Sequence, residues 1–158
     1  MTATATITAT AAADFEKQIE AKINAIRRPV QAAMAHMFYD VVVGNLGDSG
    51  VDRPTVWPQL SDRSAIGRAY IRKVGRRHAT LLETGALQSA IKMDGTQEES
   101  GTVSISDSDC HYATRHQFGD PGRGLPSRPY FPIRDGEVTE KTTTLVNEAA
   151  REALKELL

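Results

Sequence analysis

The sequence predicts an α+β fold, with a long N-terminal helix and a C-terminal helix packed on a small, mainly antiparallel β-sheet. Apolar residues recur at steps of three and four from Phe15 to Val41, and a similar pattern follows Glu137, as expected of two amphipathic helices. Residues 102–106 (TVSIS) alternate apolar with small polar side chains, which is typical of a strand with one solvated face. A long Gly/Pro-rich loop is expected over residues 119–132.

Length and composition indicate one ordinary globular domain. The chain has 158 residues, 40% of them hydrophobic, and its formal net charge of −1 excludes a global attraction to nucleic acid or acidic membranes. The single cysteine, Cys110, excludes an internal disulfide framework and fits a reducing cytoplasm. No apolar run approaches the roughly 20 residues of a membrane helix, so no membrane partner is expected. We expect a flexible arm over residues 1–13 and a single domain over residues 14–158.

The first helix is predicted to begin at Asp14, which suits an N-cap position. Pro29 interrupts it without shifting the phase of the apolar residues, so we expect a kink or two abutting helices. The Thr/Ala-rich arm before it is either a floppy tail or a strand that orders on a partner's sheet edge. The apolar stripe of this helix consists of Phe15, Ile19, Ile23, Ile26, Val30, Met34, Met37 and Val41.

The sheet is predicted from three short segments. Residues 89–94 and 102–107 form a hairpin around a polar loop, and residues 129–133 are a candidate third strand. A short helix is expected over residues 62–74, and the C-terminal helix is expected from Glu137 onward.

Charge is distributed unevenly along the chain. Residues 63–78 carry six positive side chains and no acid, whereas residues 93–110 carry five acids and no Lys or Arg. Two such segments suit self-complementary or head-to-tail contact between copies, although two solvated faces would look the same. The basic segment also suggests an alternative function, a small DNA-contacting protein that binds phosphates by charge. Its candidate contacts are Arg68, Arg72, Lys73, Arg76 and Arg77.

Residues 111–133 (HYATRHQFGDPGRGLPSRPYFPI), which we call the hook, are the best candidate for a functional surface. Three glycines allow sharp turns and the prolines stiffen the chain, while aromatic residues stand at both ends. Aromatic and arginine side chains supply most of the energy of protein interfaces. We therefore expect a subunit interface here; the alternative is that the hook packs on its own domain. The candidate interface residues are Tyr112, His116, Gln117, Phe118, Arg123, Arg128, Tyr130 and Phe131.

Catalytic and metal-binding patterns are weak. His111 and His116 have the spacing of a His pair in zinc sites, but Cys110 is directly adjacent and no second cysteine or HExxH element follows. A metal-dependent hydrolase built on these two histidines would require stoichiometric metal. No phosphate-binding or dinucleotide-binding fingerprint is present. We expect a protein that is not an enzyme and has no cofactor and no metal.

Four motifs occur in an order that resembles the virion morphogenesis, or tail completion, proteins of tailed bacteriophages. They are Trp57-Pro58-Gln59-Leu60-Ser61, the run LETGALQSAI at residues 82–91, Tyr112-Ala113 with His116-Gln117-Phe118-Gly119, and LPSRPYF at residues 125–131. The family pattern resembles W-x-P-L-S, L-x-x-T-G-x-L-x-x-S-I, Y-A-x-x-H-Q-F-G and I-P-x-R-P-F. This chain departs from it at Ala90, Leu125 and Tyr130. The match covers residues 54–133.

The resemblance implies a small α+β protein of the phage neck, where a DNA-filled head joins a tail. It implies a homo-oligomeric ring, by analogy a hexamer, with no enzymatic activity. Partners would be other copies of the chain and the neck and tail proteins beside it, the tail terminator and the connector or stopper, with genomic DNA passing through the lumen. The protein would be assembled in the bacterial host cytoplasm and reside in the virion.

Overall fold

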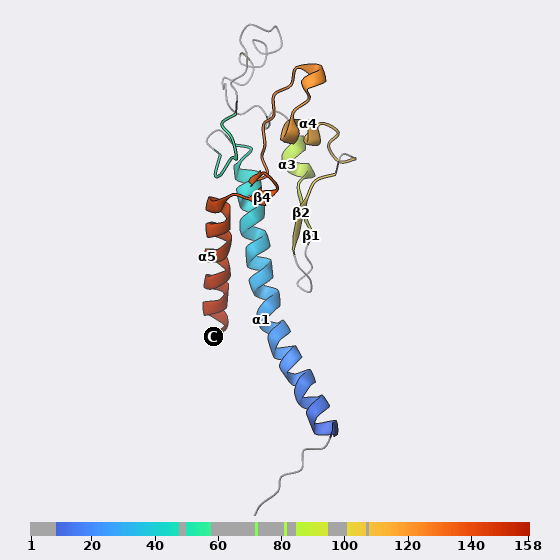
Figure 1. Cartoon of the computed structure of the whole chain (residues 1–158), viewed down its shortest axis with the longest axis vertical. Helices are drawn as coiled ribbons and strands as arrows, with labels where there is room; N and C mark the ends of the chain where they lie inside the picture. Colours follow the sequence, from blue (N-terminus) through green and yellow to red (C-terminus); the bar gives the residue numbers. More distant parts are fainter. Residues whose placement is uncertain are drawn as a thin grey trace, which may run out of the picture.

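A computed structural model describes residues 9–47, 50–57, 72, 81, 85–94, 101–106 and 108–158. Its described part has an α+β architecture, as predicted, with two long helices beside two small antiparallel hairpins (Figure 1). In chain order the elements are α1 (Ala9–Gly44), α3 (Ala86–Ala90), β1 (Lys92–Asp94), β2 (Thr102–Ser104), α4 (Ala113–Phe118), the 3-10 turn η1 (Pro121–Arg123), β3 (Ile133–Arg134), β4 (Glu137–Val138) and α5 (Glu140–Leu157). The helix predicted over residues 62–74 lies outside the described residues, apart from Arg72.

Helix α1 is a single continuous helix that contains Pro29. Figure 1 shows that its N-terminal part runs at an angle to the rest, which fits a proline kink rather than a break. The predicted start at Asp14 was wrong, because the helix already begins at Ala9. Residues 9–13 are mainly alanine, the strongest helix former, and they extend the helix into the segment that we had expected to be a flexible arm.

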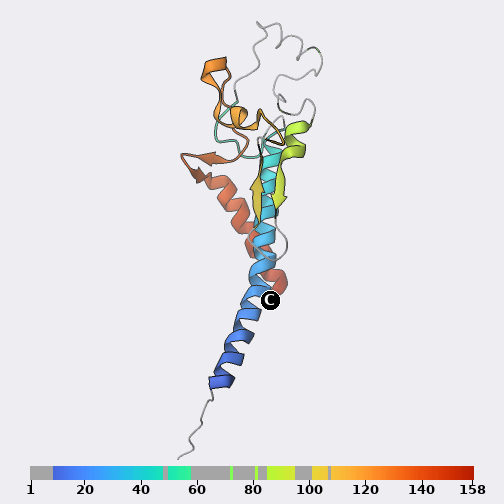
Figure 2. The same ribbon diagram turned by 90° about the vertical axis from the view of Figure 1, so that its right-hand side faces the viewer.

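Helix α5 packs antiparallel against α1 (Figures 1 and 2). It begins at Glu140, not at the predicted Glu137, which instead pairs in β4. The cap of α5 comes from a distant loop: an Asp52 carboxylate oxygen accepts hydrogen bonds from the Thr142 backbone N–H at 2.9 Å and the Thr142 hydroxyl at 2.6 Å. Thr139 also donates its hydroxyl to this oxygen. Asp52 thereby fixes the start of α5 beside the C-terminal end of α1.

The strands form two separate hairpins instead of one sheet. Strands β1 and β2 pair antiparallel, with Met93 opposite Val103, which confirms the predicted hairpin in shorter form. Strands β3 and β4 form the second hairpin around a turn at Asp135 and Gly136, both with positive φ. The predicted third strand over 129–133 was wrong except at its last residue, because two prolines in that segment have no N–H to donate to a ladder.

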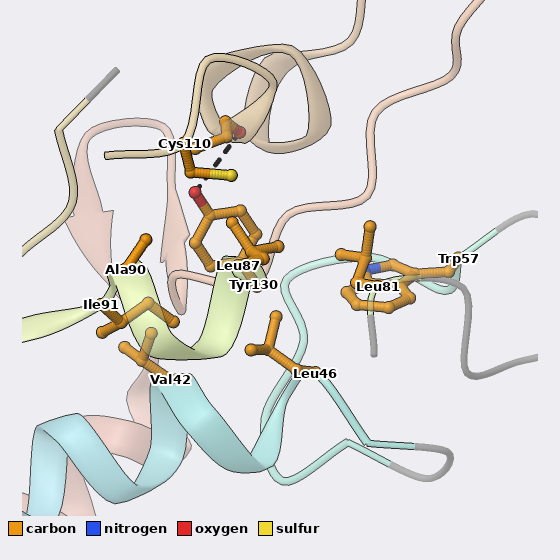
Figure 3. Close-up of a cluster of buried hydrophobic side chains, with 10 residues drawn as sticks. Val42, Leu46, Trp57, Leu81, Leu87, Ala90, Ile91, Cys110 and Tyr130 are labelled. Atoms are coloured by element: carbon orange, nitrogen blue, oxygen red, sulfur yellow. Dashed lines mark hydrogen bonds between the residues drawn. The ribbon is translucent and has the colours of Figure 1, made fainter. Parts of the chain in front are cut away.

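The hydrophobic core lies around the C-terminal end of α1 (Figure 3). Val42 of α1 and Leu46, directly after the helix, contact α3 and the segment that returns from the hook, and both are fully buried. Trp57 closes one side of the core, and its indole N–H donates to the Pro129 carbonyl at 3.0 Å. The remaining members are Leu81, Leu87, Ala90, Ile91, Cys110, Ala113 and Tyr130. Within the described residues, none of the helices has the length and apolarity needed to cross a membrane.

Candidate functional site

The hook is a closed, hydrogen-bonded structure. Helix α4 ends at Gly119, and the chain then turns back so that Asp120 and Leu125 exchange backbone hydrogen bonds of 2.9 and 3.0 Å. Gly119 has a φ of 81°, and a Cβ there would meet the Ser127 nitrogen at 3.0 Å. Only glycine therefore fits this position without strain. The sequence prediction of a stiff, shaped loop is consistent with this geometry.

Gln117 joins the two limbs of the hook. Its side-chain oxygen accepts the backbone N–H groups of both Tyr130 and Phe131, each at 3.0 Å. In addition, the Arg128 backbone N–H donates to the His116 carbonyl at 2.6 Å. These bonds give the returning limb the partners that a strand ladder would otherwise supply. Gln117 thus holds the hook together rather than reaching toward a neighbouring subunit.

Tyr130 packs the hook onto its own domain. Its ring is 1% exposed, and its hydroxyl donates to the Ala113 carbonyl at 3.3 Å (Figure 3). Its own carbonyl accepts from the Asn45 side-chain amide at 3.0 Å. For this residue the alternative interpretation, packing within the domain, describes the structure, and Tyr130 is removed from the candidate interface anchors.

Two of the three arginines of the hook, Arg123 and Arg128, differ in exposure. Arg128 is only 7% exposed, and burial lowers the pKa of its guanidinium. Arg123 is exposed and lies 3.5 Å from the Asp120 carboxylate, and Arg115 lies 3.7 Å from the same carboxylate oxygen. Arg123 is therefore accessible to a partner, whereas Arg128 is enclosed by its own domain.

An apolar groove of about 800 Å³ lies beside the hook. Phe118, at the end of α4, borders the groove and is 75% exposed, although a large aromatic side chain is normally covered. Ile133 also borders the groove and is 40% exposed. The groove is further lined by Pro54, Thr55, Ser104, Ile105, Thr114, Gln117, Ser127, Pro129, Tyr130, Phe131, Arg134, Asp135 and Gly136. The groove therefore exposes apolar side chains beside the hook.

Tyr112 lies between two histidines. Its ring stands edge-on to His111 at 5.4 Å and to His116 at 5.5 Å between centroids. Burial lowers the pKa of the His116 imidazole, and the positive charge of Arg128 lowers it further, so both effects favour the neutral form of this imidazole. Among the residues that the structure describes, no three His, Cys, Asp or Glu side chains gather as metal ligands would.

Sequence reasoning missed the residues that anchor the hook. Asn45, completely buried, donates to the carbonyls of Asp52 and Tyr130 and accepts from the backbone of Val51 and Asp52 at 2.9 and 2.7 Å. It joins the end of α1 to the 50–52 segment and to the returning limb. The available signal was its place directly after the apolar stripe of α1, where a polar residue follows the end of the helix.

The basic segment falls mostly outside the described residues. Of its candidate DNA contacts, Arg68, Lys73, Arg76 and Arg77 are not described, and Arg72 is helical and exposed. On the acidic side, Asp109 is paired within the chain, because the Lys92 ammonium donates to its carboxylate at 2.8 Å.

Comparison with known proteins gives no match to any family model, to any curated protein or to any solved structure.

Proposed function

We propose that this chain is a structural phage assembly protein of the neck, or tail-completion, type, which forms an oligomeric ring that joins a tail to a DNA-filled head. One observation supports the proposal: the sequence motif that resembles the phage family and an exposed apolar surface lie at the same residues. The YAxxHQFG motif that resembles the phage family is α4 itself with its two flanking residues, and its Phe118 stands exposed at an apolar groove.

The proposed mechanism is docking between copies through this groove. Phe118 and Ile133 would contact an apolar segment of the neighbouring subunit, and exposed Arg123 would pair with a carboxylate at the rim. Tyr112, half-buried, would widen the apolar contact. A groove on one face that receives a different surface of the next copy gives a heterologous contact, and such contacts form a ring when the rotation from copy to copy closes.

The first test is electron microscopy of lysates from a particle-producing strain with this gene deleted. Filled heads separated from finished tails, restored to joined particles when the gene is added back, would support the proposal. Normal particles in normal number would overturn it, and binding of random duplex DNA by the basic segment would then be measured.

A matched pair of variants tests the groove itself. Phe118→Ala should leave heads and tails unjoined, because it removes the exposed aromatic side chain at the groove. Val56→Ala changes a side chain that is 96% exposed and does not line the groove, and it should complement fully. Both variants should express as folded protein, since each removes an exposed side chain. Full complementation by Phe118→Ala would remove Phe118 from the mechanism.

A further inference from the structure

The apolar stripe of α1 extends toward the N-terminus beyond the elements that pack on the helix. Phe15, Ile19, Ile23 and Ile26 are 63%, 41%, 56% and 39% exposed, whereas Val41 near the other end is 1% exposed. At 100° per residue, residues 15, 19, 23, 26 and 30 lie within an arc of roughly 80°. They form one continuous face, which is normally buried against another element.

Helix α5 covers this face only in part. One groove is bordered by Met34 and Phe38 of α1 and by Val146 and Asn147 of α5. These residues therefore lie at about the same height along the two helices. With a rise of about 1.5 Å per residue in both antiparallel helices, α5 ends roughly level with residue 24 of α1. Figures 1 and 2 show α1 continuing well past the C-terminus, and in the described part of the chain no other element lies beside it there.

The charges that flank the exposed face indicate its occupant. Glu20 and Arg27, both exposed, lie on one edge of the apolar stripe, and exposed Lys22 lies on the other. When two identical helices pair antiparallel, equivalent edges face each other, and when they pair parallel, opposite edges meet. Antiparallel pairing places Glu20 opposite the partner's Arg27 at two symmetric positions. Parallel pairing would bring Lys22 close to the partner's Arg27 at two positions.

We propose that the N-terminal half of α1 is a dimerisation surface on which a second copy of this chain docks with its own α1 antiparallel. The register that pairs Glu20 with the partner's Arg27 also stacks Ile23 on the partner's Ile26 and Ile19 on the partner's Val30. The last turns of α5 lie beside Ile26 and Val30, but they leave Ile26 39% exposed and Val30 half-buried. Four apolar layers thus form around the two-fold axis, and the contact is isologous. This surface is distinct from the groove at the hook and does not depend on the proposed function.

The decisive measurement is the solution mass of the full-length protein and its variants by sedimentation. Ile23→Asp should halve the mass of the wild-type species, because it introduces a charge into two central layers of the pair. Ile23 is more than half exposed in the single chain, so the variant should fold normally. It should keep the helical circular dichroism of the wild type, and its melting temperature should equal that of wild-type protein diluted until it is monomeric. A wild-type monomer, or an unchanged mass for Ile23→Asp, would overturn the proposal.

Charge variants test the orientation. Arg27→Glu should weaken dimerisation by roughly three- to tenfold, because each attraction to Glu20 becomes a repulsion. The double variant Glu20→Arg with Arg27→Glu should restore it. Lys17→Glu, exposed on the opposite side of the helix, is the matched control and should change nothing. Tighter association of Arg27→Glu would indicate parallel helices, since the introduced carboxylate would then face the partner's Lys22, and would overturn the antiparallel arrangement.

Discussion

The C-terminal end of α1 and the turn after it bury Val41, Val42 and Leu46 and leave no more than 1% of each exposed, whereas the N-terminal half of α1 leaves Phe15 and Ile23 more than half exposed. The apolar periodicity is the same along both halves. The difference lies in polar anchoring. Buried Asn45 ties one end to two other segments, so chain that is distant in sequence is held over the apolar face. Periodicity alone therefore identifies which face of a helix is apolar, and polar contacts determine what covers that face.

The largest expected effect comes from removing the anchor. Asn45→Ala deletes the partner of buried backbone groups in two segments, and each unsatisfied group costs on the order of 1 kcal/mol. We expect a loss of about 3 kcal/mol in the free energy of unfolding, or a melting temperature lowered by roughly 10 °C. The measurement is thermal unfolding followed by circular dichroism.

Asn24→Ala on the exposed half of the same helix is the matched control for that experiment. Asn24 is exposed, and we expect a change within about 0.5 kcal/mol. Similar losses for the two variants would mean that the two ends of α1 are stabilised in the same way, and the comparison above would fail.

The sequence predicts the elements of this fold better than their connections. The stripe from Phe15 to Val41 predicts α1 because helical burial repeats every 3.6 residues, and the alternation at 102–106 predicts a hairpin. It does not predict that Asp52 caps α5, because that bond joins residues 90 positions apart. For the same reason Tyr130 looks like an interface residue in sequence: an aromatic between prolines has no local signal that separates burial from exposure.

Asp52→Ala, which removes the cap of α5, should cause a smaller loss of stability than Asn45→Ala. Loss of an N-cap carboxylate costs about 1 to 2 kcal/mol, so α5 should detach more readily from the anchored end of α1. Amide hydrogen exchange over residues 142–145 should accelerate, while exchange within α3 changes little. Equal acceleration in both places would show that Asp52 contributes to global rather than local stability.

Acid should reproduce this loss in the wild-type protein. Burial raises the pKa of Asp52, but the hydrogen bonds from Thr139 and Thr142 and the charge of Lys141 outweigh it, so the pKa lies below its ordinary value of 3.8. A carboxylate with a lowered pKa stabilises the fold above pH 3.8, and this stability is lost as the pH falls through the folded-state pKa. The difference in melting temperature between wild type and Asp52→Ala should therefore shrink below about pH 4.

The smallest effect concerns His116, where the hook returns to the anchored end of the molecule. Burial and the nearby Arg128 hold the pKa of this imidazole below its ordinary value of 6.5. Between pH 6.5 and the folded-state pKa the unfolded chain binds a proton that the folded chain does not, so stability falls as the pH falls. His116→Gln keeps the backbone bond to Arg128 and removes the titrating group.

Between about pH 7.5 and 5.5 the wild type should lose roughly 1 to 3 °C more in melting temperature than His116→Gln. His36→Gln is the control, because His36 is exposed on α1, and that variant should follow the wild-type slope. If the melting temperature of the wild type falls more steeply with pH than that of His116→Gln, the hook keeps the His116 imidazole buried and neutral, just as the core keeps Tyr130 buried. Equal slopes of melting temperature against pH in all three proteins would mean that water and protons reach His116 freely. The hook would then resemble the N-terminal half of α1, which is exposed to solvent, rather than the core.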